Sequence, residues 1–253
     1  MKVPLLITSS VIAYDVAVKL KDTNLRKIHA LESIGKWLKL DPSLQIILCD
    51  GSNYNFAKDV EHHFPSANIE CLYFDNDQVK VEKYGRGYGE GEIVKYAIIH
   101  SSHIKKIGAF AKCSSKLWVE NFSECIKQWN GFILFSGFFE NTYSLLKSSQ
   151  LRNIDTRFYI INLAVYEHLF QNAHITMRSR EGHGLEDSFY DIFMSKVHSA
   201  CLLTIPPIIR GIGGGSGLYY RESYFKRLKN QLRLIILRRN SKLKHLFIKS
   251  SSI

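Results

Sequence analysis

The first third of the chain alternates short apolar runs with amphipathic stretches. Residues 2–10 and 45–50 are apolar runs that end at polar residues, and residues 69–74 predict a third strand. Between the first two, residues 25–38 carry apolar side chains at the spacing of one helix face, namely Leu25, Ile28, Leu31, Ile34 and Leu38. Residues 56–64 predict a second helix. Strands and helices in this alternation predict a mostly parallel sheet flanked by helices.

The remainder of the chain predicts more elements of both kinds. We expect a helix over 92–100 and strands over 104–113 and 132–139. Asp155 stands where an N-cap would, and it predicts a helix running to Phe170. A shorter helix is expected over 189–197. These elements extend the same α/β organisation toward the C-terminus.

The polar end of the second apolar run is the first candidate for chemistry. Residues 45–49 read as a buried strand, and Asp50, Gly51 and Ser52 follow it directly. Open α/β sheets bind ligands beyond the carboxyl ends of their strands, which would place Asp50 at the mouth of a site. Alternatively, Asp and Gly stand here only because they suit a tight turn.

Glycine concentrates in two segments. Residues 83–91 hold four glycines before a helix, where the backbone and the helix N-terminus could approach a phosphate. This segment is neither a P-loop nor a dinucleotide fingerprint, and a flexible connection is the alternative. Residues 210–217 form a second glycine-rich loop. Between the two loops, Glu186 and Asp187 precede a helix, where the macrodipole alone also favours acids.

Composition narrows the class of protein. The chain has 253 residues, 45% of them hydrophobic, enough for the core of one domain. No apolar run reaches the ~20 residues of a membrane span, and residues 4–18 lack the features of a secretory signal, so we expect a cytoplasmic protein. Five scattered cysteines indicate reduced, buried thiols. The net charge of +11 favours an anionic partner without choosing among nucleic acid, acidic lipid and phosphorylated small molecules.

Positive charge and apolar residues are interspersed in the last part of the chain. Residues 219–248 mix Lys and Arg with Leu, Ile and Phe, the pattern of an amphipathic basic helix that lies on an anionic membrane surface. A solvated helix packed on its own domain is the alternative. We therefore divide the chain into a catalytic domain, 1–221, and a basic amphipathic C-terminal tail, 222–253.

The order of these features resembles the GT-A nucleotide-sugar glycosyltransferases, especially the bacterial enzymes that assemble surface polysaccharides such as lipopolysaccharide, O-antigen and capsule. Residues 5–10 and 48–52 are similar to the two elements that hold the nucleoside in that family, and the resemblance covers roughly residues 3–221. It implies a Rossmann-like sheet and transfer of a sugar, with inversion, from a nucleotide sugar to a glycan or lipid-linked glycan. A UDP-sugar is the expected donor, and the inner face of the cytoplasmic membrane the expected location.

The resemblance also implies roles for particular residues. Asp187 is the expected general base, with Glu186 as the second choice. The expected donor-binding residues are Thr8, Ser9, Asp50, Gly51, Ser52, Arg86, Gly87, Gly89, Lys112 and Lys116. On the side of the acceptor or the diphosphate we expect Arg157, His183, Arg210, Gly214 and Ser216.

One departure from the family concerns metal. Members usually carry Asp-x-Asp after a strand at the position where this chain has residues 111–115, Ala-Lys-Cys-Ser-Ser. We therefore favour a reaction without a metal cofactor, in which Lys or Arg side chains neutralise the diphosphate. The alternative is that Asp75 and Asp77 bind Mn²⁺ or Mg²⁺.

Two other functions compete with this interpretation. A sugar nucleotidyltransferase uses a related fold but usually has a glycine-rich, cationic loop after its first strand, whereas residues 8–14 contain neither glycine nor a cation. A nucleic-acid-binding protein would also suit the charge, but no recognised binding module is visible. We expect no nucleic-acid partner.

Overall fold

The computed structural model describes residues 2–144, 146–178, 181–197, 200–221 and 223–248. Its centre is a six-stranded sheet in the order β3–β2–β1–β4–β7–β6. The strands are β1 (Leu5–Ser9), β2 (Ile46–Asp50), β3 (Ile69–Tyr73), β4 (Ala109–Ser114), β6 (Ile133–Glu140) and β7 (Gln150–Asn162). Strands β1 to β4 are mutually parallel, and β7 is antiparallel to both β4 and β6. The predicted α/β class with a mostly parallel sheet is confirmed.

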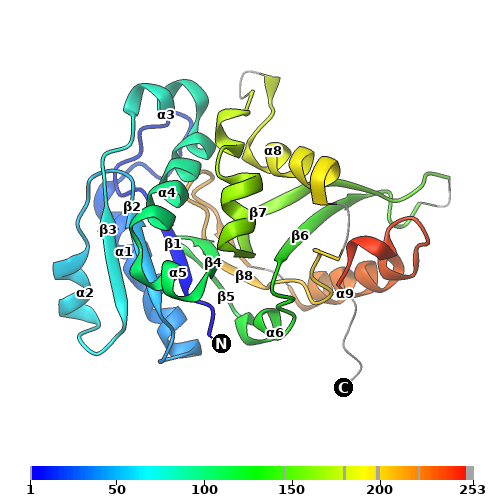
Figure 1. Cartoon of the computed structure of the whole chain (residues 1–253), viewed down its shortest axis with the longest axis horizontal. Helices are drawn as coiled ribbons and strands as arrows, with labels where there is room; N and C mark the ends of the chain where they lie inside the picture. The colour runs from blue at the N-terminus through cyan, green and yellow to red at the C-terminus, as the bar shows by residue number, and fades with distance from the viewer. Residues whose placement is uncertain (1, 145, 179–180, 198–199, 222, 249–253) are drawn as a thin grey trace.

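Helices cover both faces of this sheet (Figure 1). Successive side chains of a strand point to opposite faces, so Leu6 and Ile47 join a core under α4 and α8, whereas Leu5 and Ile46 join a second core under α1. The α-helices are α1 (Thr23–Leu40), α2 (Ala57–His63), α3 (Gln78–Tyr84), α4 (Arg86–His100), α5 (Ser102–Ile107), α6 (Phe122–Ile126), α7 (Leu163–Val165), α8 (Leu185–Ile192) and α9 (Tyr224–Arg239). The shorter helical turns are η1 (Tyr166–Phe170), η2 (Ala173–Ile175), η4 (Phe193–Val197) and η5 (Lys244–Leu246).

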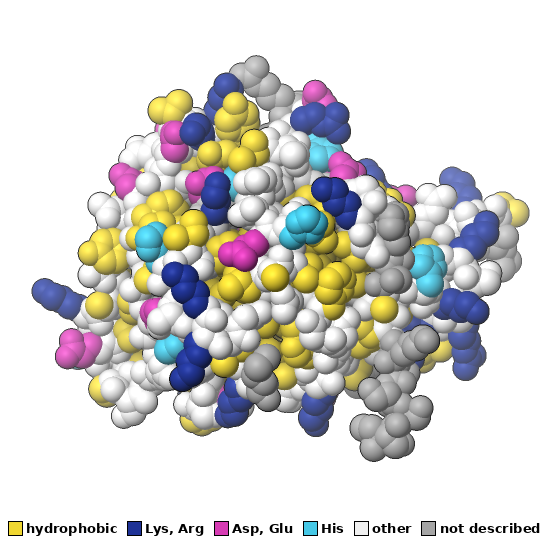
Figure 2. All heavy atoms as spheres, viewed as in Figure 1, with side chains coloured by type: hydrophobic (Ala, Val, Ile, Leu, Met, Phe, Trp, Pro, Cys, Tyr) yellow, Lys and Arg dark blue, Asp and Glu magenta, His cyan; other side chains and the backbone are white. Residues whose placement is uncertain are grey.

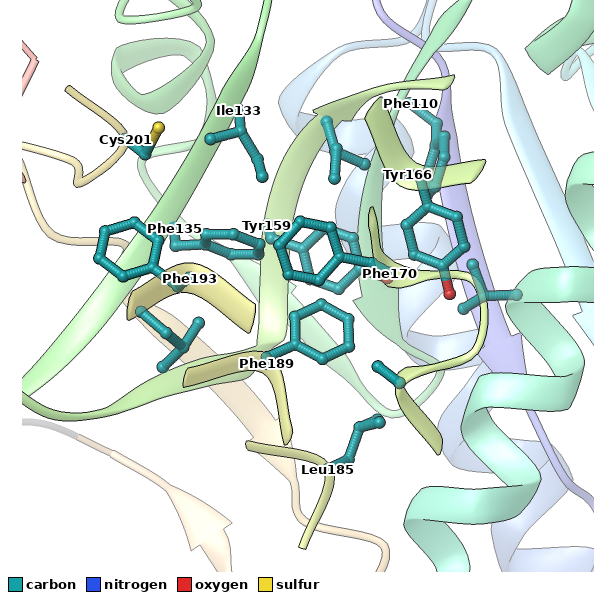
Figure 3. Packing of buried hydrophobic residues seen from close by; sticks show 14 of the residues in the cluster. Phe110, Ile133, Phe135, Tyr159, Tyr166, Phe170, Leu185, Phe189, Phe193 and Cys201 are labelled. Carbon is teal, nitrogen blue, oxygen red and sulfur yellow. The ribbon is translucent and has the colours of Figure 1, made fainter. Parts of the chain in front are cut away.

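Aromatic side chains hold α8 against the antiparallel side of the sheet. Phe135 of β6 contacts Tyr159, Phe170, Phe189 and Phe193 at ring-centroid distances of 5.6 to 6.5 Å (Figure 3). All five rings are buried. Because η1, α8 and η4 each contribute a ring to this cluster, the start of α8 is fixed relative to the strands.

The predicted strand over 104–113 is wrong in its first half. Ser101 caps α5 by accepting the Ile104 N–H, and Gly108 ends that helix with φ of 71°. Only then does β4 begin. A left-handed residue at this place costs glycine little and ends a helix readily, which explains the switch from helix to strand at Gly108.

The predicted helix over 155–170 is wrong over residues 155–162, whereas residues 163–170 are helical as predicted, in α7 and η1. Residues 150–162 form the long strand β7, which is hydrogen-bonded to β4 on one side and to β6 on the other. The Asp155 carboxylate binds the Arg157 side chain and does not cap a helix. Asn162 is the residue that caps, accepting the N–H groups of Ala164 and Val165. Pairing on both edges outweighs the local capping signal.

The glycine-rich segment 83–91 is mostly helical and not a loop. α3 ends at Tyr84, Gly85 takes a φ of 85°, and α4 starts at Arg86. The glycines of α4 serve close packing, since a Cβ on Gly91 would overlap the ring of His174. The close approach at Gly91 serves helix packing, and the predicted approach of this backbone to a phosphate stays a prediction.

A small second sheet holds the other glycine-rich loop, residues 210–217, in position. It consists of β5 (Leu117–Val119), β8 (Ile209–Ile212) and β9 (Tyr219–Tyr220), in the order β5–β8–β9. β5 continues directly from the end of β4, and the loop 213–218 joins β8 to β9. The glycines therefore lie beside the carboxyl end of β4.

The basic C-terminal segment is helical in α9, as predicted, but its end packs into the core. Leu237, Leu246 and Phe247 are at most 4% exposed, and the Phe247 ring stacks on Phe139. No helix in the described part of the chain is long and apolar enough to span a membrane. Residues 222 and 249–253 lie outside the described part, and the domain boundary after residue 221 stays a prediction.

Candidate active site

A cavity of about 250 Å³ opens at the carboxyl ends of β1 and β4. Its walls include the β1–α1 connection, the first turns of α4, residues 114–117, residues 156–157 of β7, the start of α8, and the loop 213–216. The position is the crevice in which open α/β sheets bind ligands. Thr8, near the end of β1, lies in the wall of the cavity and has a buried Oγ1 with no hydrogen-bond partner among the described residues.

Two cations in the wall, Lys116 and Arg86, form no ion pair within the described part of the chain. A third, Arg26, is hydrogen-bonded to backbone carbonyls. Lys116 is 7% exposed, and its Nζ donates to Ser115 Oγ at 3.0 Å. Burial, and then the charge of Arg26, lower the pKa of Lys116 to about 7. A buried ammonium of this kind gains most from a bound anion.

The loop of three successive glycines packs against both of these cations. A Cβ on Gly214 would lie 2.8 Å from Lys116 Cε, and one on Gly215 would lie 2.6 Å from Arg86 Nη1. Any larger residue would therefore displace the Lys116 or Arg86 side chain. The backbone of Gly215 is also tied to the other wall, because its carbonyl accepts the Lys19 N–H at 3.0 Å.

Arg26 fixes the connection that follows β1. Its Nε and Nη2 donate to the Ser10 carbonyl at 2.8 and 2.6 Å, and its Nη1 donates to the Leu20 carbonyl at 2.9 Å. Burial lowers the pKa of Arg26, although an arginine stays charged at physiological pH. This guanidinium adds positive potential behind Lys116.

Three carboxylates line the cavity, and two of them are engaged. Asp15 accepts the backbone N–H groups of Ala17 and Arg86, and Glu90 forms a salt bridge with the fully buried Lys112. Glu186, in the first turn of α8, is the third. Burial raises the pKa of Glu186, against the effect of a backbone hydrogen bond that this carboxylate accepts. Nearby Glu90 and Asp155 also raise this pKa, and Arg86 opposes them. A carboxylate with a raised pKa is a stronger base.

Asp187 has a different local role. Its carboxylate accepts the Gly184 N–H at 2.9 Å and so caps α8 from within the first turn. It does not line the cavity. The acidic pair thus divides into a capping residue and a residue that faces the cavity, and the predicted order of the two as general base is not the order that the geometry favours.

Asp50 is completely buried and its carboxylate is used inside the protein. One oxygen accepts the Val11 N–H at 3.0 Å, and the other accepts the N–H groups of Ser52 and Tyr54 and the Ser52 hydroxyl. Asp50 does not line the cavity, and neither do Gly51 and Ser52. Its geometry is that of a residue that organises the loops after β1 and β2.

The structure therefore brings part of the predicted site together. The predicted residues that line the cavity are Thr8, Ser9, Arg86, Gly89, Lys116, Arg157, Glu186, Gly214 and Ser216. The predicted residues that lie outside its lining are Asp50, Gly51, Ser52, Gly87, Lys112, His183, Asp187 and Arg210. Of the latter, Gly87 packs on Met177 and Leu185, His183 pairs with Asp191, and Arg210 pairs with Glu120. Lys112 donates to Thr156 O at 2.9 Å.

The alternative metal ligands each have a partner. Asp75 Oδ1 accepts the Tyr14 hydroxyl at 2.9 Å, and Asp77 caps α3 and pairs with Lys80. Among the described residues, no group of three or more His, Cys, Asp or Glu side chains could hold a metal ion. Metal dependence stays a prediction.

Comparison with known proteins gives remote similarities only. No protein-family model matches the sequence, and no curated protein does. Among solved structures, the chain is similar to 4-diphosphocytidyl-2C-methyl-D-erythritol synthase, with 14% identity and a TM-score of 0.43 over 92% of this chain and 98% of that one.

Two sugar-transferring enzymes are similar to a comparable degree. The bifunctional glycosyltransferase WbbM matches with 11% identity and a TM-score of 0.42, over 76% of this chain and 36% of that one. Mouse xyloside xylosyltransferase 1 matches with 9% identity and a TM-score of 0.42, over 78% of this chain and 82% of that one. The reaction has to be inferred from the cavity itself.

Several residues of the cavity were missed by the sequence analysis. Arg26 belongs to a predicted helix face, Glu90 stands among the glycines of α4, and Tyr220 follows the second glycine-rich loop. Tyr14, Asp15 and Asn76 were missed as well. Glu90 and Tyr220 adjoin segments that were singled out, which was a usable signal. Arg26 gave none, because its burial results from contacts with distant loops.

Proposed function

We propose that the chain is a glycosyltransferase that moves a sugar from a nucleotide sugar to a glycan or lipid-linked glycan. The observation that carries this proposal is the content of one cavity: two cations without carboxylate partners, Arg86 and Lys116, and one carboxylate with a raised pKa, Glu186. The cations suit a diphosphate, and the carboxylate suits removal of a proton from an attacking hydroxyl.

In the proposed reaction the acceptor oxygen attacks the anomeric carbon of the donor. As the new C–O bond forms, the bond from that carbon to the diphosphate oxygen breaks with its electron pair. Glu186 takes the proton of the acceptor hydroxyl, and Arg86 and Lys116 stabilise the charge on the departing nucleoside diphosphate. A single displacement of this kind inverts the anomeric configuration.

Glu186 is preferred to Asp187 as the base because of its position. Glu186 lines the cavity, whereas the Asp187 carboxylate is held by the Gly184 N–H. Asp187 would support the site by fixing the first turn of α8.

A sugar nucleotidyltransferase is the second candidate, and one observation favours it. The sequence after β1 lacks glycines and cations, but the loop 213–217 and the side chains of Arg26 and Lys116 come to lie beside that strand end in space. The tip of β1 is therefore next to a glycine-rich, cationic environment after all. Such an enzyme would release pyrophosphate from a nucleoside triphosphate.

The proposed setting is the inner face of the cytoplasmic membrane, in assembly of a bacterial surface polysaccharide. α9 exposes an apolar stripe that includes Phe225, Leu228, Leu232 and Ile236, between 42% and 81% exposed. Lys and Arg side chains gather on the side of the molecule that carries α9 (Figure 2). This combination supports shallow attachment to an anionic surface.

Donor binding is tested by a thermal-shift screen of UDP-, GDP-, dTDP- and CMP-sugars, with Mn²⁺ and with EDTA. A ligand that binds only the native state raises the melting temperature. We expect one nucleotide class, UDP first, to raise it in both conditions, and the shift to shrink in Lys116→Met. A screen in which no nucleotide sugar shifts the melting temperature would count against the proposal.

A further inference from the structure

A second cavity lies between α9 and strand β6, on the side of the molecule where the C-terminal segment packs. Its volume is about 530 Å³. Much of its wall is apolar, contributed by Phe138, Phe139, Leu203, Pro206, Pro207, Ile209, Leu218, Leu234 and Phe247. We call this cavity the α9 groove. An apolar space of this size can hold an extended hydrocarbon chain.

Polar groups of the α9 groove point to an anion at the end of such a chain. Arg233 and Arg221 line it, as does Ser136. Both Arg233 Nε and Ser136 Oγ are buried without a hydrogen-bond partner in the described structure. Buried donors of this kind are costly unless a ligand or water completes them. A phosphate oxygen is an acceptor that either donor could use.

The α9 groove adjoins the active-site cavity. Arg157 and Tyr220 line both spaces and form part of the wall between them. Asp155 holds the Arg157 guanidinium through two hydrogen bonds of 2.8 and 2.6 Å, and this guanidinium lies 5.0 Å from the Tyr220 ring and 5.8 Å from the Phe138 ring. A ligand in the groove would therefore end beside the reacting atoms.

We propose that the α9 groove binds the acceptor, and that this acceptor is an amphipathic phosphate whose apolar chain lies along β6 and whose phosphate lies near Arg233. The inference rests on the proposed function, since it needs a donor in the neighbouring cavity. The exposed apolar stripe of α9 lies on the same helix that roofs the groove. A molecule anchored in a membrane would thus enter the groove beneath the attached helix.

The test uses decyl phosphate below its micellar concentration, with binding to the full-length protein measured by isothermal titration calorimetry. Two variants alter the groove: Arg233→Gln removes the charge, and Leu218→Trp narrows the mouth from a side chain that is 68% exposed. Arg239→Gln is the matched control, because Arg239 is an exposed arginine of the same helix outside the groove. UDP is titrated into every variant.

We expect decyl phosphate to bind the native chain and the Arg239→Gln control equally. Arg233→Gln should weaken it about tenfold or more, Leu218→Trp should weaken it as well, and UDP affinity should not change. Decyl glucoside, which has the same chain without the charge, should bind less tightly than decyl phosphate.

Other outcomes overturn the inference. UDP binding without decyl phosphate binding would remove the acceptor from this groove and leave the proposed function standing. Failure of both ligands would end the proposed function and this inference with it. Equal weakening in Arg233→Gln and Arg239→Gln would mean non-specific attraction. A dimer in sedimentation that Leu218→Trp dissociates would mean that a second copy occupies the groove.

Discussion

Lys116 offers the sharpest test of how the cavity binds a diphosphate. Its pKa is lowered to about 7, so at pH 7 about half of the molecules carry the charge. At pH 9 about one molecule in a hundred does. A diphosphate binds the protonated form preferentially, so the dissociation constant of UDP should rise roughly 50-fold between pH 7 and pH 9. Ionisation of a phosphate group is nearly complete by pH 7 and contributes little to this rise.

The assay is calorimetric titration of UDP at pH 7, 8 and 9 into the native chain and into Lys116→Met. Removing a charged hydrogen-bond donor costs about 1.5 to 3 kcal/mol, so the variant should bind UDP about 10- to 100-fold more weakly at pH 7. Its affinity should no longer depend on pH above 7. An unchanged pH dependence in the variant, or a flat profile in the native chain, would refute the assignment.

The same lowered pKa has a consequence for stability. Between pH 7 and 10.5 the unfolded chain binds a proton at Lys116 that the native chain has lost, so the free energy of unfolding should rise with pH in that window. Lys116→Met should lack this rise and should be more stable than the native chain at pH 7. Chemical denaturation of both proteins at pH 7 and pH 9 measures the pH dependence and the difference in stability. It also shows whether the variant is folded.

Four further predictions concern the base, the strand end, the metal and the membrane. Glu186→Gln should lower the rate of sugar transfer by roughly 10²-fold with donor affinity preserved, whereas Asp187→Asn should mainly destabilise α8. Steady-state kinetics and melting curves of both variants distinguish the two effects. A loss of transfer in Asp187→Asn, with normal transfer in Glu186→Gln, would make Asp187 the base. Asp50→Ala should lower the free energy of unfolding, measured by urea denaturation, by about 1 to 3 kcal/mol. A variant of unchanged stability that binds the donor weakly would instead mean that Asp50 contacts the donor. Transfer should survive EDTA, and complete loss with rescue by Mn²⁺ would show a required metal. Leu232→Asp should reduce sedimentation of the protein with anionic liposomes relative to Val79→Asp, a control at another exposed position. Equal sedimentation of the two variants would mean that α9 does not attach the protein to the membrane.

Strands β1 and β2 could be predicted from sequence because they are almost entirely apolar and buried on both faces. Runs such as 45–50 have no other stable environment, and their carboxyl ends identify the edge where the cavity lies. Strand β7 could not be predicted in the same way. Asp155 looks like a helix cap locally, and only pairing with β6 on one side and β4 on the other makes the segment a strand.

The candidate site divides along the same line. Thr8 and Ser9 end a recognisable strand, and the glycines at 213–215 are visible as a cluster, so both were found. The division of labour between Glu186 and Asp187 was not, because it depends on which side chain the helix turns toward the cavity. The hydrogen bonds of Asp50 to Val11 and Tyr54 could not be predicted for a related reason, because they exist only in the folded loops.

The central claim is that this cavity releases a nucleoside diphosphate from a nucleotide sugar with Glu186 as base. The most direct measurement follows product release by the native chain and by Glu186→Gln, first with the nucleotide sugar that stabilises the fold and then with nucleoside triphosphate plus sugar 1-phosphate. The account predicts release of the nucleoside diphosphate in the first mixture, strongly reduced in the variant, and no pyrophosphate in the second. Pyrophosphate release from the triphosphate mixture, with the nucleotide sugar left intact, would contradict it.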